Sequence, residues 1–274
     1  MCDLCVMNAV KDRLLSRRDL FRSASAAGAG ALLGASAAPA VALGASSGQM
    51  ADMTHVLDEN FPTFSNKSTF HLKQRSRFEK VGFNTKEIVV NEHSGTHIDA
   101  PLHFSADGAS VDEIPVERLI VPLAVIDIRA KAAENADSQL TPDDLKCWTD
   151  THGPFPKGCC VAMNSGWAAH VNTPRFRNAD WGGTLHFPGF HVEAVQMLLE
   201  EGDDIAGIAV DTLSLDIGPS PDFPTHCAWL PTGRWGLECI ANLDQVPHAG
   251  ATLIVGAPKF KGGTGGPSRV FTLF

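Results

Sequence analysis

The segment formed by residues 93–104 constrains the fold more than any other part of the chain. It reads His-Ser-Gly-Thr-His-Ile-Asp-Ala-Pro-Leu-His-Phe and therefore places three imidazoles and one carboxylate close together in sequence. A helix would turn Asp99 about 200° away from His97. Gly95 and Pro101 also oppose a helix. We conclude that this segment is not helical.

A straight strand fails as well, although it presents the polar side chains on one side. The four polar residues all lie at odd-numbered positions: His93, His97, Asp99 and His103. At roughly 3.3 Å per residue, the first and last would lie about 33 Å apart. Metal ligands must converge to about 2.0–2.2 Å from one ion. We therefore expect a strand end that bends at its glycine and its proline into a loop.

The side chains of this segment are nitrogen and oxygen ligands of a borderline divalent metal. The alternative is a surface loop with ordinary polar residues, which would suit a single histidine. Four ligand-type residues at this density favour a metal site instead. Zinc and manganese both accept this ligand set, so both stay candidates.

Further ligands must come from another part of the chain, and His226 and Glu238 are the candidates. A Pro-Thr-Gly turn signal at residues 231–233 lies between them and can fold the segment back on itself. Each also has a mundane interpretation, as a surface histidine and a helix-start glutamate. Cys227 and Cys239 directly follow the two candidates, and we expect them to be packing residues rather than thiolate ligands.

Residues 1–45 have the pattern of an export signal. Ser-Arg-Arg-Asp-Leu-Phe-Arg at 16–22 precedes a weakly hydrophobic run rich in Ala and Gly, and small residues at 40–42 suit a signal peptidase. The pattern resembles a twin-arginine signal, with Leu20 and Phe21 in reversed order. We expect the twin-arginine export machinery to deliver the protein to the periplasm. An uncleaved anchor or a disordered tail is the alternative.

The length of 274 residues suits one large domain or two small ones, and the composition indicates a globular protein. Hydrophobic residues make up 44% of it, and its net charge of −9 with no basic patch argues against binding to nucleic acid. Five cysteines follow residue 45, an odd number that does not indicate a disulfide framework.

Apolar runs and turn signals predict a strand-rich α/β domain at residues 46–274, with one mixed sheet. Two helices are expected, one starting at Thr141-Pro142 with an acidic first turn and one over His191–Glu201 before Gly202. The expected strands are Lys86–Glu92, Val121–Ile128, Cys159–Asn164, Ile205–Thr212, Thr252–Ala257 and Val270–Phe274.

Several motifs resemble one known family. The segment at 93–104 resembles the signature of the cyclase family of metal-dependent hydrolases, which includes bacterial kynurenine formamidase and isatin hydrolase. Further matches are Asn-Ser-Gly-Trp at 164–167, Phe-Pro-Gly at 187–189, the run at 207–216, and Lys-Gly-Gly at 261–263 with Pro-Ser-Arg at 267–269. The resemblance covers nearly all of residues 46–274.

The resemblance implies a swivelling β/β/α fold, usually a homodimer, with one or two divalent ions per chain. The first ion would be held by His93, His97 and Asp99. Asp99 and Glu238 would bridge to a second ion, which His226 also binds.

His103 matches the family's catalytic histidine and can carry a proton to a leaving group. A further metal ligand is its alternative role. The resemblance to kynurenine formamidase implies a Trp in the substrate pocket, ahead of the ligand segment. Residues 49–92 contain no Trp, so Phe61 and Phe64 are the nearest aromatic candidates for substrate binding. Four tryptophans could line an aromatic pocket, but packing is the expected role of each: Trp167, Trp181, Trp229 and Trp235.

The sequence therefore predicts a hydrolase that uses a metal-activated water to open an amide, lactam, formamide or lactone bond of a small aromatic or cyclic substrate. The alternative is a non-catalytic periplasmic protein that binds a metal or small ligand. A structural metal site is usually closed and often contains cysteine. The His and carboxylate ligands here, with His103 to spare, favour catalysis.

Overall fold

The computed structural model describes residues 48–200 and 205–274. The predicted export signal lies outside the described residues, as does Gly202. Within the described part of the chain, no helix has the length and apolar character needed to span a membrane.

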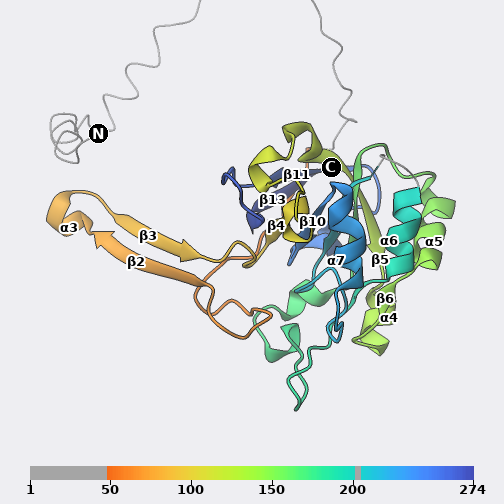
Figure 1. The fold of residues 1–274 in the computed structure, drawn as a ribbon, viewed down its shortest axis with the longest axis horizontal. Helices are drawn as coiled ribbons and strands as arrows, with labels where there is room; N and C mark the ends of the chain where they lie inside the picture. Colours follow the sequence, from red (N-terminus) through yellow and green to blue (C-terminus); the bar gives the residue numbers. More distant parts are fainter. Residues whose placement is uncertain (1–47, 201–204) are drawn as a thin grey trace, which may run out of the picture. The chain divides into compact units, whose positions relative to one another are not determined.

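One mixed sheet organises the described residues (Figure 1). Its four central strands run parallel, and antiparallel strands extend it on both sides. In spatial order the nine described strands are β1 (Met50–Asp52), β13 (Arg269–Leu273), β11 (Ala251–Gly256), β5 (Ile120–Asp127), β7 (Cys159–Asn164), β9 (Ile205–Val210), β10 (Trp235–Glu238), β4 (His97–Asp99) and β12 (Gly265–Pro267).

The sheet is buried on both faces, so its central strands are continuous apolar runs. Every residue of β7 and β9 is buried. Side chains alternate along β5: Leu123 and Val125 enter one core cluster, and Ala124 and Ile126 enter the cluster on the opposite face. The sheet therefore separates two apolar cores.

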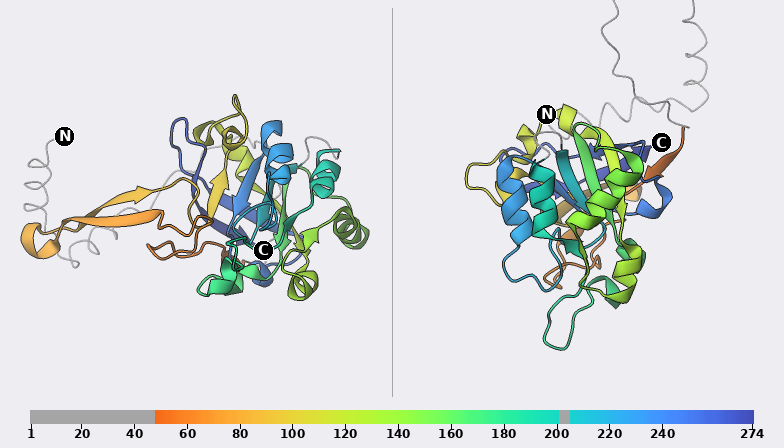
Figure 2. Two further views of the ribbon diagram at one scale, coloured as in Figure 1. Left: turned by 60° about the horizontal axis from the view of Figure 1, so that its bottom comes forward. Right: turned by 90° about the vertical axis from the view of Figure 1, so that its right-hand side faces the viewer.

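Helices α5 (Pro142–His152) and α6 (Val192–Glu200) cover one face of the sheet (Figures 1 and 2). A capping box starts α5, because the Asp144 carboxylate accepts hydrogen bonds from the backbone and hydroxyl of Thr141. The other described helices and strands are short: α4 (Arg129–Glu134), α7 (Pro224–Trp229), β6 (Gln139–Leu140), β8 (Gly189–Phe190) and the 3₁₀ turns Val111–Glu113, Val116–Arg118, Trp167–His170, Pro174–Phe176, Leu230–Thr232 and Leu243–Gln245.

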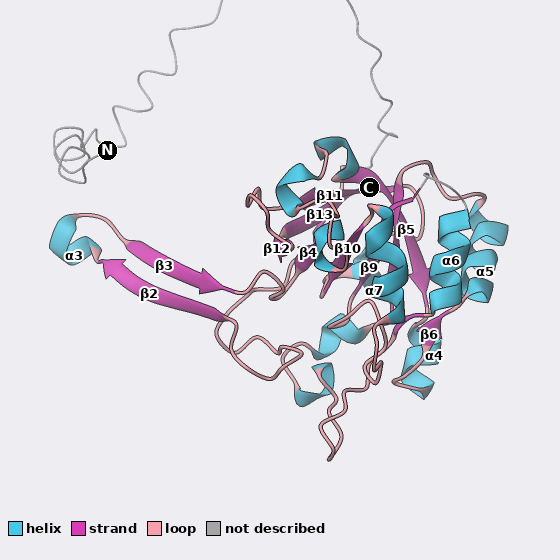
Figure 3. Cartoon of the chain, viewed as in Figure 1, coloured by secondary structure: helices cyan, strands magenta, loops and turns pink. Residues whose placement is uncertain are grey.

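A hairpin arm extends away from the main sheet (Figures 1 and 3). It consists of β2 (Phe70–Ser76), α3 (Phe78–Val81) and β3 (Thr85–Val90), and its two strands form a sheet of their own. The strand expected at Lys86–Glu92 is thus found in the arm and not in the main sheet. Exposed apolar side chains on the arm include Phe78, Ile88 and Val89.

The predicted fold class is confirmed: the described residues form one α/β domain with a mixed sheet. The expected strands other than that in the arm lie in the main sheet within two residues of their predicted ends, and both helices are present. The short strands β4, β10 and β12 were not predicted. All three border the candidate site.

Candidate active site

The predicted ligand segment enters the main sheet as β4, between β10 and β12. Before the strand, Gly95 makes the tight turn with a φ of 65°. After it, the 3₁₀ helix Pro101–His103 begins with proline at its first turn. The expected bends at the glycine and the proline are both present, but the segment between them is a sheet strand.

The register between β10 and β4 brings Glu238 to the ligand segment. In the antiparallel pair of β10 and β4, Glu238 lies directly opposite His97. Their side chains approach to 3.4 Å between Glu238 Oε2 and His97 Nε2. Glu238 ends a strand, so its interpretation as a helix-start residue is wrong.

Helix α7 supplies His226 from another direction, and Asp216 holds that helix in place. The Asp216 carboxylate accepts the backbone N–H of Thr225 at 2.7 Å and of His226 at 3.2 Å. It also accepts the ring N–H of His226 from Nδ1 at 2.6 Å. The remaining nitrogen, Nε2, faces Glu238 Oε1 at 3.1 Å and Asp99 Oδ2 at 3.7 Å.

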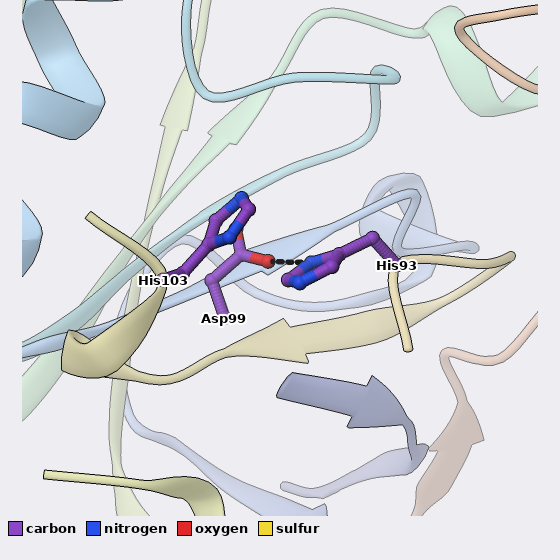
Figure 4. A group of neighbouring side chains, drawn as sticks. All are labelled: His93, Asp99 and His103. Atoms are coloured by element: carbon purple, nitrogen blue, oxygen red, sulfur yellow. Dashed lines mark hydrogen bonds and ion pairs between the residues drawn. The ribbon is translucent and has the colours of Figure 1, made fainter. Parts of the chain in front are cut away.

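The Asp99 carboxylate lies at the centre of the predicted ligands, which we call the ligand cluster. Its Oδ1 lies 2.7 Å from His93 Nδ1 and 3.3 Å from His97 Nε2. Figure 4 shows the contact between this carboxylate and the His93 ring, with His103 nearby. The structure thus brings all five predicted ligands together: His93, His97, Asp99, His226 and Glu238.

Two buried atoms of the cluster fit a bound cation. His97 donates from Nδ1 to the backbone carbonyl of Gly95 at 2.8 Å, so Nε2 is the ring nitrogen that faces the cluster. Within the described residues, His97 Nε2 and Asp99 Oδ2 are buried and make no hydrogen bond. Buried polar atoms rarely lack a partner, and a divalent ion would satisfy both. Two triads have the required spacing: His97 with Asp99 and Glu238, and His93 with Asp99 and His103.

The charges of the cluster shift its ionisation strongly. Burial lowers the pKa of His97, but the carboxylates of Asp99 and Glu238 outweigh burial and raise it to about 9. Burial opposes ionisation of Asp99, yet the surrounding histidines hold the pKa of its carboxyl well below its usual range. Without an ion, the carboxylates thus draw a proton onto the His97 imidazole; with an ion, the same charges stabilise the cation.

His103 lies beside the cluster, and its pKa is shifted in the opposite direction to that of His97. Its ring stacks on that of His93, with centroids 3.8 Å apart and planes inclined by 23°. Burial is the main cause that lowers the pKa of His103 to about 4. A neutral imidazole at this place can accept a proton. Its membership of a ligand triad also keeps its alternative role as a ligand open.

A cavity of about 340 Å³ opens onto the cluster. His97, His103, His226 and Glu238 form its polar end. Its apolar walls come from Phe61, Phe64, Phe104, Leu213 and Phe223. A larger cavity of about 910 Å³ shares Phe61 but contains none of the predicted ligands. We place the candidate site in the smaller cavity, where the ionisable groups converge.

The tryptophans and cysteines mostly follow the sequence expectations. Trp167, Trp229 and Trp235 are buried packing residues, whereas Trp181 is fully exposed. The packing role expected for Trp181 and Cys227 is therefore wrong, because both are exposed. The described cysteines form no disulfide.

Three contributors to the site were not predicted from the sequence. Asp216 could have been suspected from its place after a buried strand. Phe104 lies inside the ligand segment, but its apolar side chain did not mark it as a site residue. Phe223 has a left-handed backbone with a φ of 51°, and no sequence pattern indicates this.

Comparisons with known proteins identify the family of this chain. The family model described as "Putative cyclase" matches residues 51–217, which is more than half of the chain. The chain belongs to this cyclase family. The matched residues include the ligand segment, whereas His226 and Glu238 lie beyond them.

Two curated relatives of this cyclase-family chain are named for hydrolytic activities. Isatin hydrolase of Roseibium aggregatum is 34% identical over 244 residues, which cover 82% of this chain and 91% of that protein. Kynurenine formamidase of Salinibacter ruber is 27% identical over 195 residues, which cover 71% of this chain and 82% of that protein.

Solved structures of isatin hydrolases share the fold of this family member. Isatin hydrolase A from Labrenzia aggregata, bound to benzyl benzoate, has a TM-score of 0.76 and 36% identity and covers 82% of this chain and 93% of that one. Isatin hydrolase A from Ralstonia solanacearum has a TM-score of 0.76 and 35% identity, with coverage of 82% and 91%.

Proposed function

We propose that this protein is a metal-dependent hydrolase that opens the amide or lactam bond of a small aromatic or cyclic substrate. One observation carries the proposal: His97 Nε2 and Asp99 Oδ2 are buried without a hydrogen bond, in a cluster of ligand-type side chains beside an aromatic-walled cavity. Similarity to isatin hydrolase and kynurenine formamidase supports hydrolysis of C–N bonds.

The chain offers ligands for one or two ions. His93, His97 and Asp99 would hold the first, and Asp99, His226 and Glu238 would hold a second. When bound, zinc or manganese lowers the pKa of a coordinated water and polarises a carbonyl. The hydrogen bonds of His97 to Gly95 and of His226 to Asp216 keep the ligand nitrogens aimed inward.

His103 is the proposed proton carrier. As a neutral imidazole at the mouth of the cluster, it accepts a proton from the attacking water and delivers it to the leaving nitrogen. Its stacking on His93 fixes the ring plane. In this role His103 touches the reacting atoms without being needed to hold an ion.

The cavity supports a small planar substrate. Its volume lies at the lower end of the range for ligand pockets, and its walls carry several aromatic rings. Phe61 borders the cavity and is buried, while Phe64 is 42% exposed at its rim. We propose that both contact the non-reacting ring of the substrate.

The alternative function is a non-catalytic protein that binds a metal or a small ligand. Elemental analysis of purified protein, followed by assays with isatin, an N-formyl aryl amine and an aryl lactone, separates the two. We expect a bound divalent metal and hydrolysis that stops on chelation and returns when the ion is added back. Stoichiometric metal without turnover of any of these substrates would favour the alternative.

A variant pair tests the assigned site. His97→Ala should lose both bound metal and activity. His152→Ala, which changes an exposed histidine at the end of α5, is the matched control and should keep both. Full activity of chelated His97→Ala would exclude metal-dependent catalysis.

We also propose that the protein is exported to the periplasm by the twin-arginine route and acts as a homodimer. Replacing Arg17 and Arg18 by lysine should trap it in the cytoplasm, which cell fractionation measures. For the dimer, the support is the hairpin arm: a two-stranded hairpin is marginally stable alone, and this one exposes Phe78, Ile88 and Val89. Light scattering of the purified protein measures the mass.

A further inference from the structure

His93 is held by a hydrogen-bond chain that ends on a carboxylate outside the ligand cluster. Its Nε2 lies 2.9 Å from the Thr264 hydroxyl oxygen. The same hydroxyl lies 2.6 Å from Oε2 of Glu92. Its other ring nitrogen, Nδ1, lies 2.7 Å from Asp99 Oδ1. Both nitrogens of His93 therefore have a defined neighbour.

The chemistry of the chain fixes its direction. A carboxylate only accepts hydrogen bonds, so the hydroxyl proton of Thr264 is donated to Glu92. Thr264 must then accept the N–H of His93 from Nε2. This leaves the Nδ1 lone pair of His93 facing Asp99 Oδ1, and two acceptors at that distance need a proton or a cation between them. The chain thus selects the tautomer that presents Nδ1 to an ion.

Backbone shape at the β12 end of the sheet makes room for this arrangement. Gly265 pairs with Asp99 across β12 and β4, and a Cβ there would lie 2.9 Å from Cε1 of His93. A Cβ on Gly263 would lie 2.8 Å from Oε1 of Glu92. The glycine-rich segment at 262–266 therefore lets Thr264 and the His93 ring approach closely.

We propose that Glu92 and Thr264 are positioning residues that fix the tautomer and ring orientation of His93 and strengthen it as a metal ligand. The inference rests on the proposed metal dependence. It also gives Gly263 of the C-terminal Lys-Gly-Gly motif a role beside the site. Such hydrogen-bond partners of metal-bound histidines orient the ring and raise its basicity.

Each of the three ligand histidines is thus supported in a different way. His97 donates to a backbone carbonyl, and His226 donates directly to the Asp216 carboxylate. The Nε2 of His93, which faces away from the ligand cluster, reaches the Glu92 carboxylate only through the Thr264 hydroxyl. A hydroxyl can be removed with little change in side-chain shape, so the support of His93 can be tested by itself.

The test compares four variants by ion affinity. Thr264→Val removes the hydroxyl at nearly constant shape, Thr264→Ser keeps it, and Glu92→Gln removes the charge of the terminal acceptor. Asp112→Asn is the matched control, because Asp112 binds the backbone N–H of Gly262 in the same segment but does not contact His93. Zinc and manganese affinities are measured by competition with a chromophoric chelator, and thermal unfolding is recorded for each ion-free variant.

We expect Thr264→Val and Glu92→Gln to weaken ion affinity by about ten- to hundredfold, the usual range for such partners. Thr264→Ser should stay close to the parent, and so should Asp112→Asn. Nitrogen NMR of labelled histidine in the zinc-loaded parent should show one Nε2–H tautomer assigned to His93, and Thr264→Val should lose this signature.

Two results would overturn the proposal while leaving metal dependence intact. The first is an unchanged ion affinity in Thr264→Val whose unfolding midpoint matches the parent. The second is an Asp112→Asn affinity as low as that of Thr264→Val, which would assign the effect to the segment as a whole. A parent protein that binds neither ion would instead contradict the proposed function.

Discussion

Glu238 and His97 face each other across β10 and β4, with the Glu238 Oε2 and His97 Nε2 atoms 3.4 Å apart. The pairing register of two short strands, each buried throughout, sets this distance. A strand register is rigid on the scale that metal coordination requires, so the carboxylate and the imidazole are preorganised. Substitutions at this pair therefore report on chemistry more than on folding.

Glu238→Gln should weaken ion binding and hydrolysis while leaving the stability of the fold nearly unchanged. The amide keeps an oxygen to accept the backbone N–H of Leu215, which Glu238 Oε1 now accepts at 3.0 Å. It removes the negative charge beside His97 and His226, so we expect ion affinity to fall at least about tenfold and hydrolysis with it. Elemental analysis and substrate assays check this. Glu193→Gln on the exposed side of α6 should behave like the parent; equal losses in both would contradict the assignment.

Ion uptake should release protons, and affinity should rise with pH. In the ion-free protein the pKa of His97 is raised to about 9, so its imidazole carries a proton at neutral pH. An ion must displace that proton. Below pH 9, the apparent affinity should therefore increase by about tenfold per pH unit for each proton released. Calorimetry in buffers of different ionisation enthalpy counts the released protons. An affinity that does not change with pH would show that ion binding displaces no proton from His97.

Phe223→Gly should impair substrate binding more than stability. The left-handed backbone of Phe223 costs a non-glycine residue about 1–3 kcal/mol, and glycine relieves this strain. The lost ring contacts Phe64 and Phe104 at centroid distances of 6.0 and 6.1 Å, at the cavity wall. We expect a raised KM, little change in kcat and a small shift in Tm. Asn66→Gly, at another left-handed position, serves as the control and should leave KM unchanged.

Asp144→Asn should destabilise the fold by about 1–2 kcal/mol at neutral pH, because the carboxylate caps α5 and pairs with Lys131 at 2.6 Å. Burial opposes ionisation, but Lys131 and Thr141 lower the pKa of Asp144 below its ordinary 3.8. The contribution of Asp144 to the free energy of unfolding is therefore complete above pH 3.8. It is lost as the pH falls through the lower pKa of the folded state. Urea unfolding at several pH values measures this.

The exposed neighbour Asp143 provides the control for this experiment. Its carboxylate lies 3.6 Å from Lys146 at the surface, and Asp143→Asn should change the free energy of unfolding by well under about 1 kcal/mol. If both variants lose the same stability, the helix charge and not the cap is responsible.

The sequence predicted the ligand cluster because its residue types are rare and dense. His93, His97 and Asp99 are close in sequence, so local geometry alone required a bend. Buried strands such as β7 and β9 were also predictable, because parallel strands covered on both faces are continuous apolar runs.

The remaining parts of the site depend on pairings between distant segments. Strands β4, β10 and β12 have three or four residues each, too few for a periodic pattern. The strand at β3 was predicted from its apolar run, but no local signal placed it in an arm. Asp216 and Thr264 act only through residues distant from them in sequence, so their roles needed the tertiary structure.

The position of β12 at the end of the main sheet has a consequence for biosynthesis. Because a ribosome makes the chain from the amino end, residues 93–103 emerge long before residues 235–267 supply their two flanking strands. A nascent chain therefore carries exposed histidines without the neighbours that aim them. Selective binding of the proposed ion would have to wait until residues 235–267 have been made, and a product that stops before them would present the histidines without their flanking strands.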